Sequence, residues 1–304
     1  DRAHLIALLD RFGADHPAPD ATHFFGDLGK FRLKWEQHTE FVTYTAFLPS
    51  NGERPFDPAA WEVFPEDWLA QAPGVRITSA HLRIEVAPED DRVIAEKIGE
   101  WLVPESLAVS HVLDKTAVVA GDFRIDSHGH MRFAVFCKSD TGSRRIGRIV
   151  QRIFEIETYK AMSLLGLPTS REISTRMGEM DEGLVRLVAD MTGDLSKPDE
   201  TLGQLLSIAA ELEKLQAESA FRFGATGAYE ALVKDRVAEI GEAPLGDYPM
   251  LSTYVERRFA PAMRTCESVT ARQASLSERA TRAANLLRTR VDIKLEAQNR
   301  DLLA

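Results

Sequence analysis

The C-terminal segment of the chain, from Tyr254 to Ala304, carries apolar side chains mostly every three or four residues, with Arg and Glu between them. A helix rises about 1.5 Å per residue, so a helix over this segment would be roughly 75 Å long, more than one compact domain needs. Pro261 predicts a kink near its start, and no Gly or Pro follows that would end it. We therefore expect a stalk helix over residues 254–304 and a natural chain that extends beyond Asp1 and Ala304.

The apolar face of this helix predicts self-association. The helical segments before it are expected to be much shorter and to leave part of that face uncovered. Because burial of a leucine contributes about 1.5–3 kcal/mol, a homo-oligomer through the C-terminal helices is the simplest cover. The apolar residues that the preceding helices are not expected to cover completely are Leu276, Leu287, Val291, Leu295 and Leu302.

Charge and composition predict a domain boundary near residue 140. Residues 1–138 contain 14 basic and 22 acidic side chains, whereas residues 139–304 contain 23 and 25. All eight His and all four Trp lie in the first part. A chain of 304 residues has room for two domains, and we place them at residues 1–139 and 140–304.

The composition also excludes several classes of protein. A net charge of -10 argues against broad nucleic-acid binding, which depends on clustered Lys and Arg. Cys137 and Cys266 have no spacing typical of a metal site or a disulfide framework, which fits a reducing compartment. In the given residues, no charged start followed by an apolar core marks a signal peptide, no run of 18 or more apolar residues occurs, and no motif implies a cofactor.

The periodicity predicts an α+β fold, in which an N-terminal mixed, mostly antiparallel α/β domain is followed by an all-helical part with a long C-terminal stalk helix. Two runs, 31–36 and 40–48, predict a hairpin, and further strands are expected at 76–86, 108–113, 116–125 and 130–136. A helix is expected at 92–102, and another from Gly142 to Leu165. Thr169, with Glu172, predicts a capping box for the next helix. A later helix is expected to be interrupted between Gly224 and Gly227.

The segment from Phe24 to Phe31 superficially resembles a phosphate loop, but the first required Gly and the final Ser or Thr are missing. Gly26 and Gly29 are more simply explained as turn residues.

The best candidate for a metal site is the group Asp126, His128 and His130, because two imidazoles and a carboxylate this close in sequence could share one ion. His111 from a neighbouring strand could add a fourth ligand. These residues flank a tight turn, however, where polar side chains are also expected for solvation alone, so the turn is the stronger interpretation.

Four arginines open the first long helix: Arg144, Arg145, Arg148 and Arg152. Cations at a helix N-terminus oppose the helix dipole and are unfavourable unless they meet an anion. We expect them to form an interaction surface, which pairs with the acidic front domain or with Glu155 and Glu157. Binding of phosphate or anionic lipid is the alternative.

Two segments resemble a known family. Residues 25–41 and 148–168 are similar to those of the domain-of-unknown-function family 3422, described as predicted membrane-anchored bacterial proteins. The end of the chain, from Arg290 onward, is similar to the segment before that family's C-terminal hydrophobic region. The resemblance implies a membrane segment beyond Ala304 and implies no catalytic residues. The overall layout also resembles CorA-type magnesium channels.

The function that these observations favour is a non-enzymatic, oligomeric scaffold or partner-binding module. It would be the cytoplasm-facing part of a protein in the bacterial inner membrane. The alternatives are a metal-dependent enzyme that uses Asp126, His128 and His130, and the regulatory domain of a CorA-like ion transporter.

Overall fold

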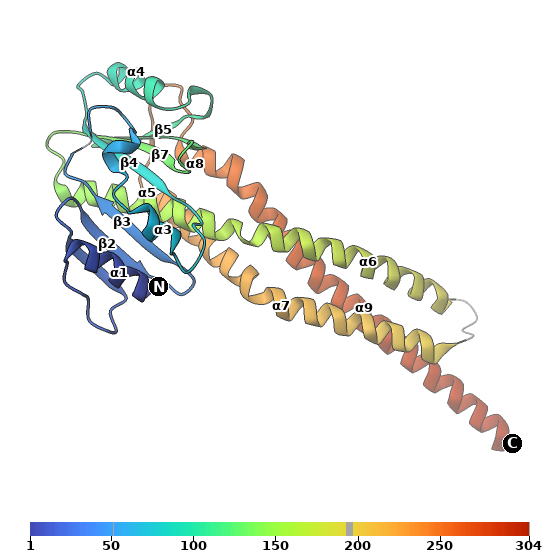
Figure 1. Cartoon of the computed structure of the whole chain (residues 1–304). Coiled ribbons are helices and arrows are strands. Elements are labelled where there is room, and N and C mark those ends of the chain that lie inside the picture. The colour runs from blue at the N-terminus through green and yellow to red at the C-terminus, as the bar shows by residue number, and fades with distance from the viewer. Residues whose placement is uncertain (51, 193–196, 304) are drawn as a thin grey trace. The chain divides into compact units, whose positions relative to one another are not determined.

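The computed structural model describes residues 1–50, 52–192 and 197–303, and their contacts form two compact units (Figure 1). Unit 1 comprises residues 1–154 and 240–251, and unit 2 comprises residues 155–239 and 252–304. Both sheets lie in unit 1, and the helical part ends in a long helix, which confirms the predicted α+β class. The expected domain boundary at residue 139 stays a prediction, because packing alone does not test which segments fold independently.

The first sheet of unit 1 has three antiparallel strands in chain order: β1 (His23–Asp27), β2 (Arg32–Gln37) and β3 (Val42–Phe47). The predicted hairpin of β2 and β3 is confirmed. Side chains alternate along β2, so that Leu33 and Trp35 are buried beneath helix α1 (Arg2–Phe12). Strand β1 was not predicted, because Gly26, expected in a turn, lies inside it and accommodates the ring of Phe24.

The second sheet has the order β4-β7-β6-β5-β8. Its strands are β4 (Ala80–Val86), β5 (Ala108–Val112), β6 (Ala117–Ile125), β7 (Met131–Cys137) and β8 (Ala243–Pro244). Strands β4 and β7 are parallel, whereas the other pairings in both sheets are antiparallel, as the sequence predicted for most of them. β4 begins later than expected, since residues 76–79 form no strand.

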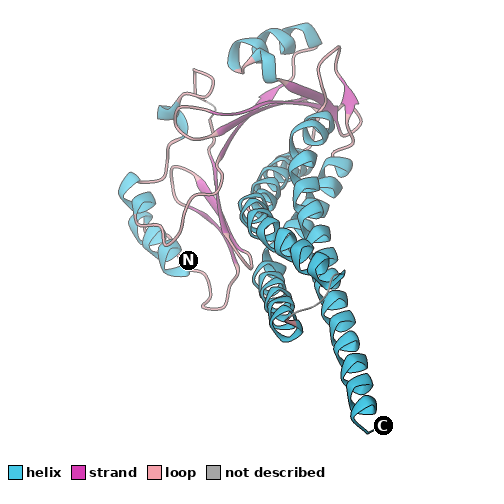
Figure 2. Cartoon of the chain, turned by 90° about the vertical axis from the view of Figure 1, so that its right-hand side faces the viewer, coloured by secondary structure: helices cyan, strands magenta, loops and turns pink. Residues whose placement is uncertain are grey.

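Helix α4 (Asp91–Trp101) packs on one face of the second sheet, visible at the top of Figure 2. Ile94 and Ile98 belong to one buried cluster with Phe136 of β7. Because side chains alternate along a strand, Ala134 and Phe136 face α4, whereas Phe133, Val135 and Cys137 face the opposite side. That opposite side is also buried, so β7 is apolar almost throughout.

A bulge in β6 places a charged pair inside unit 1. The register shifts between Gly121 and Ile125, and Phe123 adopts φ 50°. The fully buried carboxylate of Asp122 accepts hydrogen bonds from the backbone N–H of Val103 and from the guanidinium of Arg132. This buried charge is therefore paired, as its removal from water requires.

The helical unit is built around three long helices, α6 (Gly166–Thr192), α7 (Pro198–Glu239) and α9 (Ala260–Leu303) (Figure 1). The helix before them, α5 (Ser143–Leu164), contains the boundary between the two units. The three long helices share one apolar core. Its buried residues include Ile173, Met177, Leu184, Leu205, Leu212, Leu215, Val269, Leu276, Ala280 and Leu287.

The expectation that Leu276 and Leu287 lack an intramolecular cover was wrong, since both are buried in this core. The error was in the length of the partner helix. α7 has 42 residues and α9 has 44, so by the rise per residue both are roughly 65 Å long. Val291 also packs against the core, whereas the side chain of Leu302 lies outside the described residues.

Two predicted helix boundaries were wrong. α7 runs without interruption through Gly224 and Gly227, because burial of its apolar side outweighs a cost of about 1 kcal/mol for each glycine. Thr169 does not cap a helix, since α6 already begins at Gly166. Pro168 lies in the first turn of α6, where a missing N–H breaks no intrahelical bond.

A local irregularity occurs at Pro261, as expected. A single π-helical turn, η2 (Val255–Phe259), joins α8 (Leu251–Tyr254) to α9. Proline has no N–H for the carbonyl four residues earlier, and a wider turn is one way for the backbone to adjust.

The start of α6 packs closely on α7. An added Cβ at Gly166 would lie 2.3 Å from Oγ1 of Thr226, which itself donates a hydrogen bond to the carbonyl of Ser163 at 3.3 Å. We predict that Gly166→Ala lowers the free energy of unfolding by about 1–3 kcal/mol, because the two helices must separate. Gly178→Ala is the control: its added Cβ meets no atom within 4 Å, so it should stabilise the same helix by about 0.5–1 kcal/mol. Chemical denaturation of both variants measures the difference, and equal effects of the two would contradict the prediction.

Candidate functional site

Asp126 organises the turn between β6 and β7. Its Oδ1 accepts hydrogen bonds from the backbone N–H of His128 and His130, both at 2.9 Å, and Gly129 completes the turn with φ 84°. Burial alone would raise the pKa of Asp126, but these two hydrogen bonds help to hold it below its ordinary value. The carboxylate therefore has a structural role in the hairpin, as the solvation interpretation predicted.

The imidazoles of the candidate metal site contact different partners. Nδ1 of His128 lies 3.4 Å from Oε1 of Glu62, and Nδ1 of His130 lies 2.7 Å from Oγ of Ser79. Within the described residues, His, Cys, Asp and Glu form no group of three or more that could hold a metal ion. The structure thus brings Asp126, His128 and His130 together in one turn without making them a common ligand set.

The other predicted ligand, His111, lies elsewhere in the second sheet. It is on β5, where its Nε2 is 3.3 Å from Oδ2 of Asp91 on α4. It therefore does not join the group at the β6–β7 turn.

Aromatic rings surround two histidines, His81 of β4 and His130, which directly precedes β7. Trp61 ends the short helix α2 (Pro58–Trp61), with its ring centroid 4.4 Å from that of His81 and 4.3 Å from that of His130. Phe56 meets His81 edge-on at 5.1 Å. The ring nitrogens Nε1 of Trp61 and Nδ1 of His81 are buried and make no hydrogen bond within the described part of the chain. We call these four residues, Phe56, Trp61, His81 and His130, the histidine–tryptophan cluster.

Both histidines of this cluster are uncharged at neutral pH. Burial, followed by the charges of His130 and Arg83, lowers the pKa of His81 to about 4. Burial and the Arg76 guanidinium also lower the pKa of His130, although Asp126 opposes this effect. The cluster is therefore a neutral, mainly apolar contact that protonation would disrupt.

A neutral His130 beside the Ser79 hydroxyl is the first half of a nucleophile–base pair. Such a pair needs a third group that orients the imidazole, and none of the hydrogen bonds in the described ranges joins a carboxylate to this ring. Asp126, the nearest candidate, uses Oδ1 to hold the turn. The arrangement stabilises the packing of β4 and β7 and supplies no complete catalytic constellation.

Three of the four arginines at the start of α5, Arg144, Arg145 and Arg148, are exposed, and no carboxylate of the described residues pairs with them. Arg152 is half-buried further along the helix. The expected pairing of the four arginines with the acidic front domain or with Glu155 and Glu157 stays a prediction. Glu155 pairs with Arg236, and Glu157 with Lys160 at 2.5 Å. Their assignment as an interaction surface stays a prediction.

Sequence reasoning did not identify Trp61, Ser79 and His81 as neighbours of His130. Ser79 directly precedes β4 and His81 lies within it, and the parallel pairing of Ala80 with Met131 brings both to the turn. A histidine at the start of each of two apolar segments is the signal that could have found them, but the pairing of β4 with β7 is not visible in the sequence.

The low pKa of His81 predicts a pH-dependent stability. The folded state binds this proton only below about pH 4, whereas the unfolded chain binds it below about pH 6.5. Stability should therefore fall by about 2 kcal/mol between pH 6.5 and 4, after allowance for partial exposure of the ring. Because carboxylates also titrate in this window, the measurement is the difference between wild type and His81→Phe in denaturant unfolding at several pH values. His81→Phe should remove this part of the loss, and exposed His23→Phe should not. Parallel curves for wild type and His81→Phe would contradict the prediction.

Comparison with curated proteins found no match, and neither did comparison with solved structures. One family profile matches, and its description is protein of unknown function (DUF3422). The match covers residues 1–304, in agreement with the resemblance seen in the two sequence segments. The chain belongs to this family of proteins of unknown function.

Proposed function

We propose that this chain is a non-enzymatic scaffold module that associates with further copies of itself through the C-terminal end of α9. The observation that carries the proposal is the arrangement of apolar residues along this helix. Up to Leu287 and Val291 they pack into the core that α9 shares with α6 and α7. Beyond that point Ile293 is 62 % exposed and Leu295 is 51 % exposed.

Leu286 extends the exposed apolar surface of α9. It is 67 % exposed and lies seven residues before Ile293, which places both on nearly the same side of the helix. We call Leu286 and Ile293 the distal α9 surface, whereas Leu295, four residues after Val291, continues the side of the helix that is buried further back. Exposed apolar side chains at helical spacing on a long, regular element suit a symmetric helix–helix contact between identical chains.

The proposed setting is the cytoplasmic face of a bacterial inner membrane. The support is electrostatic: residues 249–304 contain 10 Lys or Arg and 6 Asp or Glu. A basic flank next to a hydrophobic span favours the cytoplasmic side, and it is attracted to anionic lipid headgroups. Among the helices that the structure describes, none combines the length and apolar character that crossing a bilayer requires.

The two alternative functions have less support. A metal-dependent enzyme needs ligands that converge on one ion, and His128 and His130 contact Glu62 and Ser79 instead. A cation-sensing domain of a transporter likewise needs grouped oxygen ligands. The carboxylates of the described residues, 1–50, 52–192 and 197–303, form no such group.

The self-association is tested with Leu286→Asp and Ile293→Asp in one chain. The wild-type chain should form a dimer or a higher oligomer in sedimentation velocity, and the double variant should dissociate at a concentration at least about tenfold higher. Each buried Leu or Ile contributes about 1.5–3 kcal/mol, and a carboxylate in the contact adds a desolvation cost. Leu206→Asp is the control, because Leu206 is 45 % exposed on α7, outside this surface. A monomeric wild type, or equal effects of the two substitutions, contradicts the proposal.

The membrane setting is tested on the natural full-length protein in its own cells. We expect it to sediment with the inner membrane and to stay there in a high-salt wash, since salt releases only proteins held by surface charge. A protease added to right-side-out vesicles should not cut the part described here, whereas inverted vesicles should expose it. Full release into the soluble fraction at low salt would contradict the setting and leave the self-association test unaffected.

A further inference from the structure

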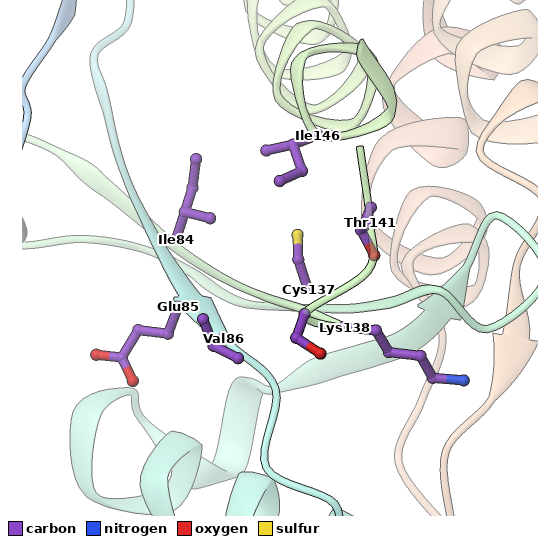
Figure 3. Close-up of a pocket in the computed structure, with 8 residues that line it drawn as sticks. Ile84, Glu85, Val86, Cys137, Lys138, Thr141 and Ile146 are labelled. Atoms are coloured by element: carbon purple, nitrogen blue, oxygen red, sulfur yellow. The ribbon is translucent and has the colours of Figure 1, made fainter. Parts of the chain in front are cut away.

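A pocket of about 480 Å³ lies at the ends of the two parallel strands of unit 1 (Figure 3). β4 and β7 both end here, and the chain continues from β7 through Lys138 and Thr141 into the first turn of α5. Its volume is within the range of about 300–1,000 Å³ that is usual for small-molecule sites. In open, mostly parallel α/β sheets, ligands bind at the carboxyl ends of the strands, and this pocket lies at the same end of the parallel pair β4–β7.

The floor of this pocket is apolar. Ile84 pairs with Val135 and Val86 with Cys137, so these side chains share the sheet face that points away from α4. Ile146 of α5 lies across from them, and Figure 3 shows it above the Cys137 sulfur. Val86 is 68 % exposed although it is apolar, which leaves part of the floor open to solvent.

The Cys137 thiol is a buried group directed into this space. The residue is 4 % exposed and forms no disulfide, and its thiol makes no hydrogen bond among the described residues. Figure 3 shows its sulfur between Ile84 and Ile146. Burial raises the pKa of the thiol, so it is neutral at physiological pH and adds polarisable, apolar surface to the floor.

The charges around the pocket favour an anion. Residues 138–148 contain four cations, Lys138 and three arginines, and one anion, Asp140. Lys138 is exposed, and it pairs with none of the carboxylates in the part of the chain that the structure describes. The nearby Glu85 is directed to the α4 side, where its oxygens bind Arg83 and Lys97, each at 2.8 Å.

Glu85 does not offset this positive balance. Burial would raise its pKa, but the hydrogen bonds from Lys97 and Arg83 hold the pKa below its ordinary value, so the carboxylate stays ionised and neutralised. The first N–H groups of α5, next to Thr141, add a partial positive charge at the same rim.

We propose that this pocket binds a small amphipathic carboxylate, whose hydrocarbon part packs on Ile84, Val86, Cys137 and Ile146 and whose head group meets the cationic segment 138–148 at the rim. An apolar floor next to a segment with four cations and one anion matches an acid that carries one charge on a short alkyl chain. The inference goes beyond the scaffold function, because it concerns unit 1 alone and does not depend on self-association or on a membrane.

Isothermal titration of the whole chain with octanoate tests this binding. Octanoate should bind in a one-to-one ratio, and octylammonium, which has the same chain and the opposite charge, should bind at least about tenfold more weakly. A diazirine analogue of octanoate should label peptides within residues 84–86 and 137–146, and unlabelled octanoate should compete with it. The absence of saturable octanoate binding, or equal binding of octylammonium, overturns the proposal.

Two pairs of variants distinguish binding in the pocket from a general effect of added negative charge on octanoate affinity. Lys138→Glu and Val86→Asp should each weaken octanoate binding by about tenfold or more, because they place a negative charge at the rim or on the floor. Lys30→Glu and Val75→Asp make the same changes at exposed positions outside the pocket, and they should leave the affinity unchanged. Equal losses in the pocket variants and the controls would overturn the proposal, and circular dichroism confirms that all four variants are folded.

Discussion

The helical unit depends on one constraint, the need to cover the apolar side of α9 along most of its length. A solitary amphipathic helix of this kind is unstable in water, since most helical stability in proteins comes from packing of the apolar face. Leu276, Ala280 and Leu287 are covered by α6 and α7 of the same chain. This requirement explains why α7 is nearly as long as α9, and why burial of its Leu205 and Leu212 keeps it helical across two glycines.

The same packing restricts which side chains fit where two helices approach closely. At the start of α6, Gly166 lies against Thr226 of α7, and a side chain there would collide with the threonine hydroxyl. Further along the bundle the polar Gln273 of α9 is buried beside Ser219 of α7, at 3.5 Å. This contact favours one register of the helices over its neighbours, because a shift would take the buried Gln273 amide away from Ser219, whereas the Ser219 hydroxyl would keep its hydrogen bond to the Leu215 carbonyl of its own helix.

The sequence predicts most of the fold because period two and the three-to-four spacing distinguish strands from helices. The hairpin of β2 and β3, the helix α4 and the stalk helix all follow from these patterns. The failures occur where a local signal competed with tertiary packing. Gly224 and Gly227 signal a break only for an isolated helix, and Thr169 signals a cap only if the preceding turn is open. Gly26 reads as a turn residue until the ring of Phe24 is seen packed over it in β1.

The candidate site was predictable only in part, for a related reason. Asp126, His128 and His130 were correctly placed at a turn, because adjacent polar residues between two strands are a local signal. Their other neighbours, Trp61 and His81, are distant in the sequence. The parallel pairing of β4 with β7 brings His81 close, and the packing of α2 places Trp61 against the rings of His81 and His130.

The arginines at the start of α5 are electrostatically unfavourable there, which favours the binding of an anion to this segment. Cations in the first turns of a helix oppose its dipole, so Arg144, Arg145 and Arg148 lower the stability of α5 unless an anion is present. Two carboxylates further along the same helix, Glu155 and Glu157, pair with Arg236 and Lys160. Because the described residues supply no carboxylate to these three arginines, an anion from outside the chain would stabilise α5 by offsetting the repulsion. The segment that carries these arginines also closes the pocket beside Cys137, so a bound carboxylate would lower this electrostatic cost and fill the apolar space with a single ligand.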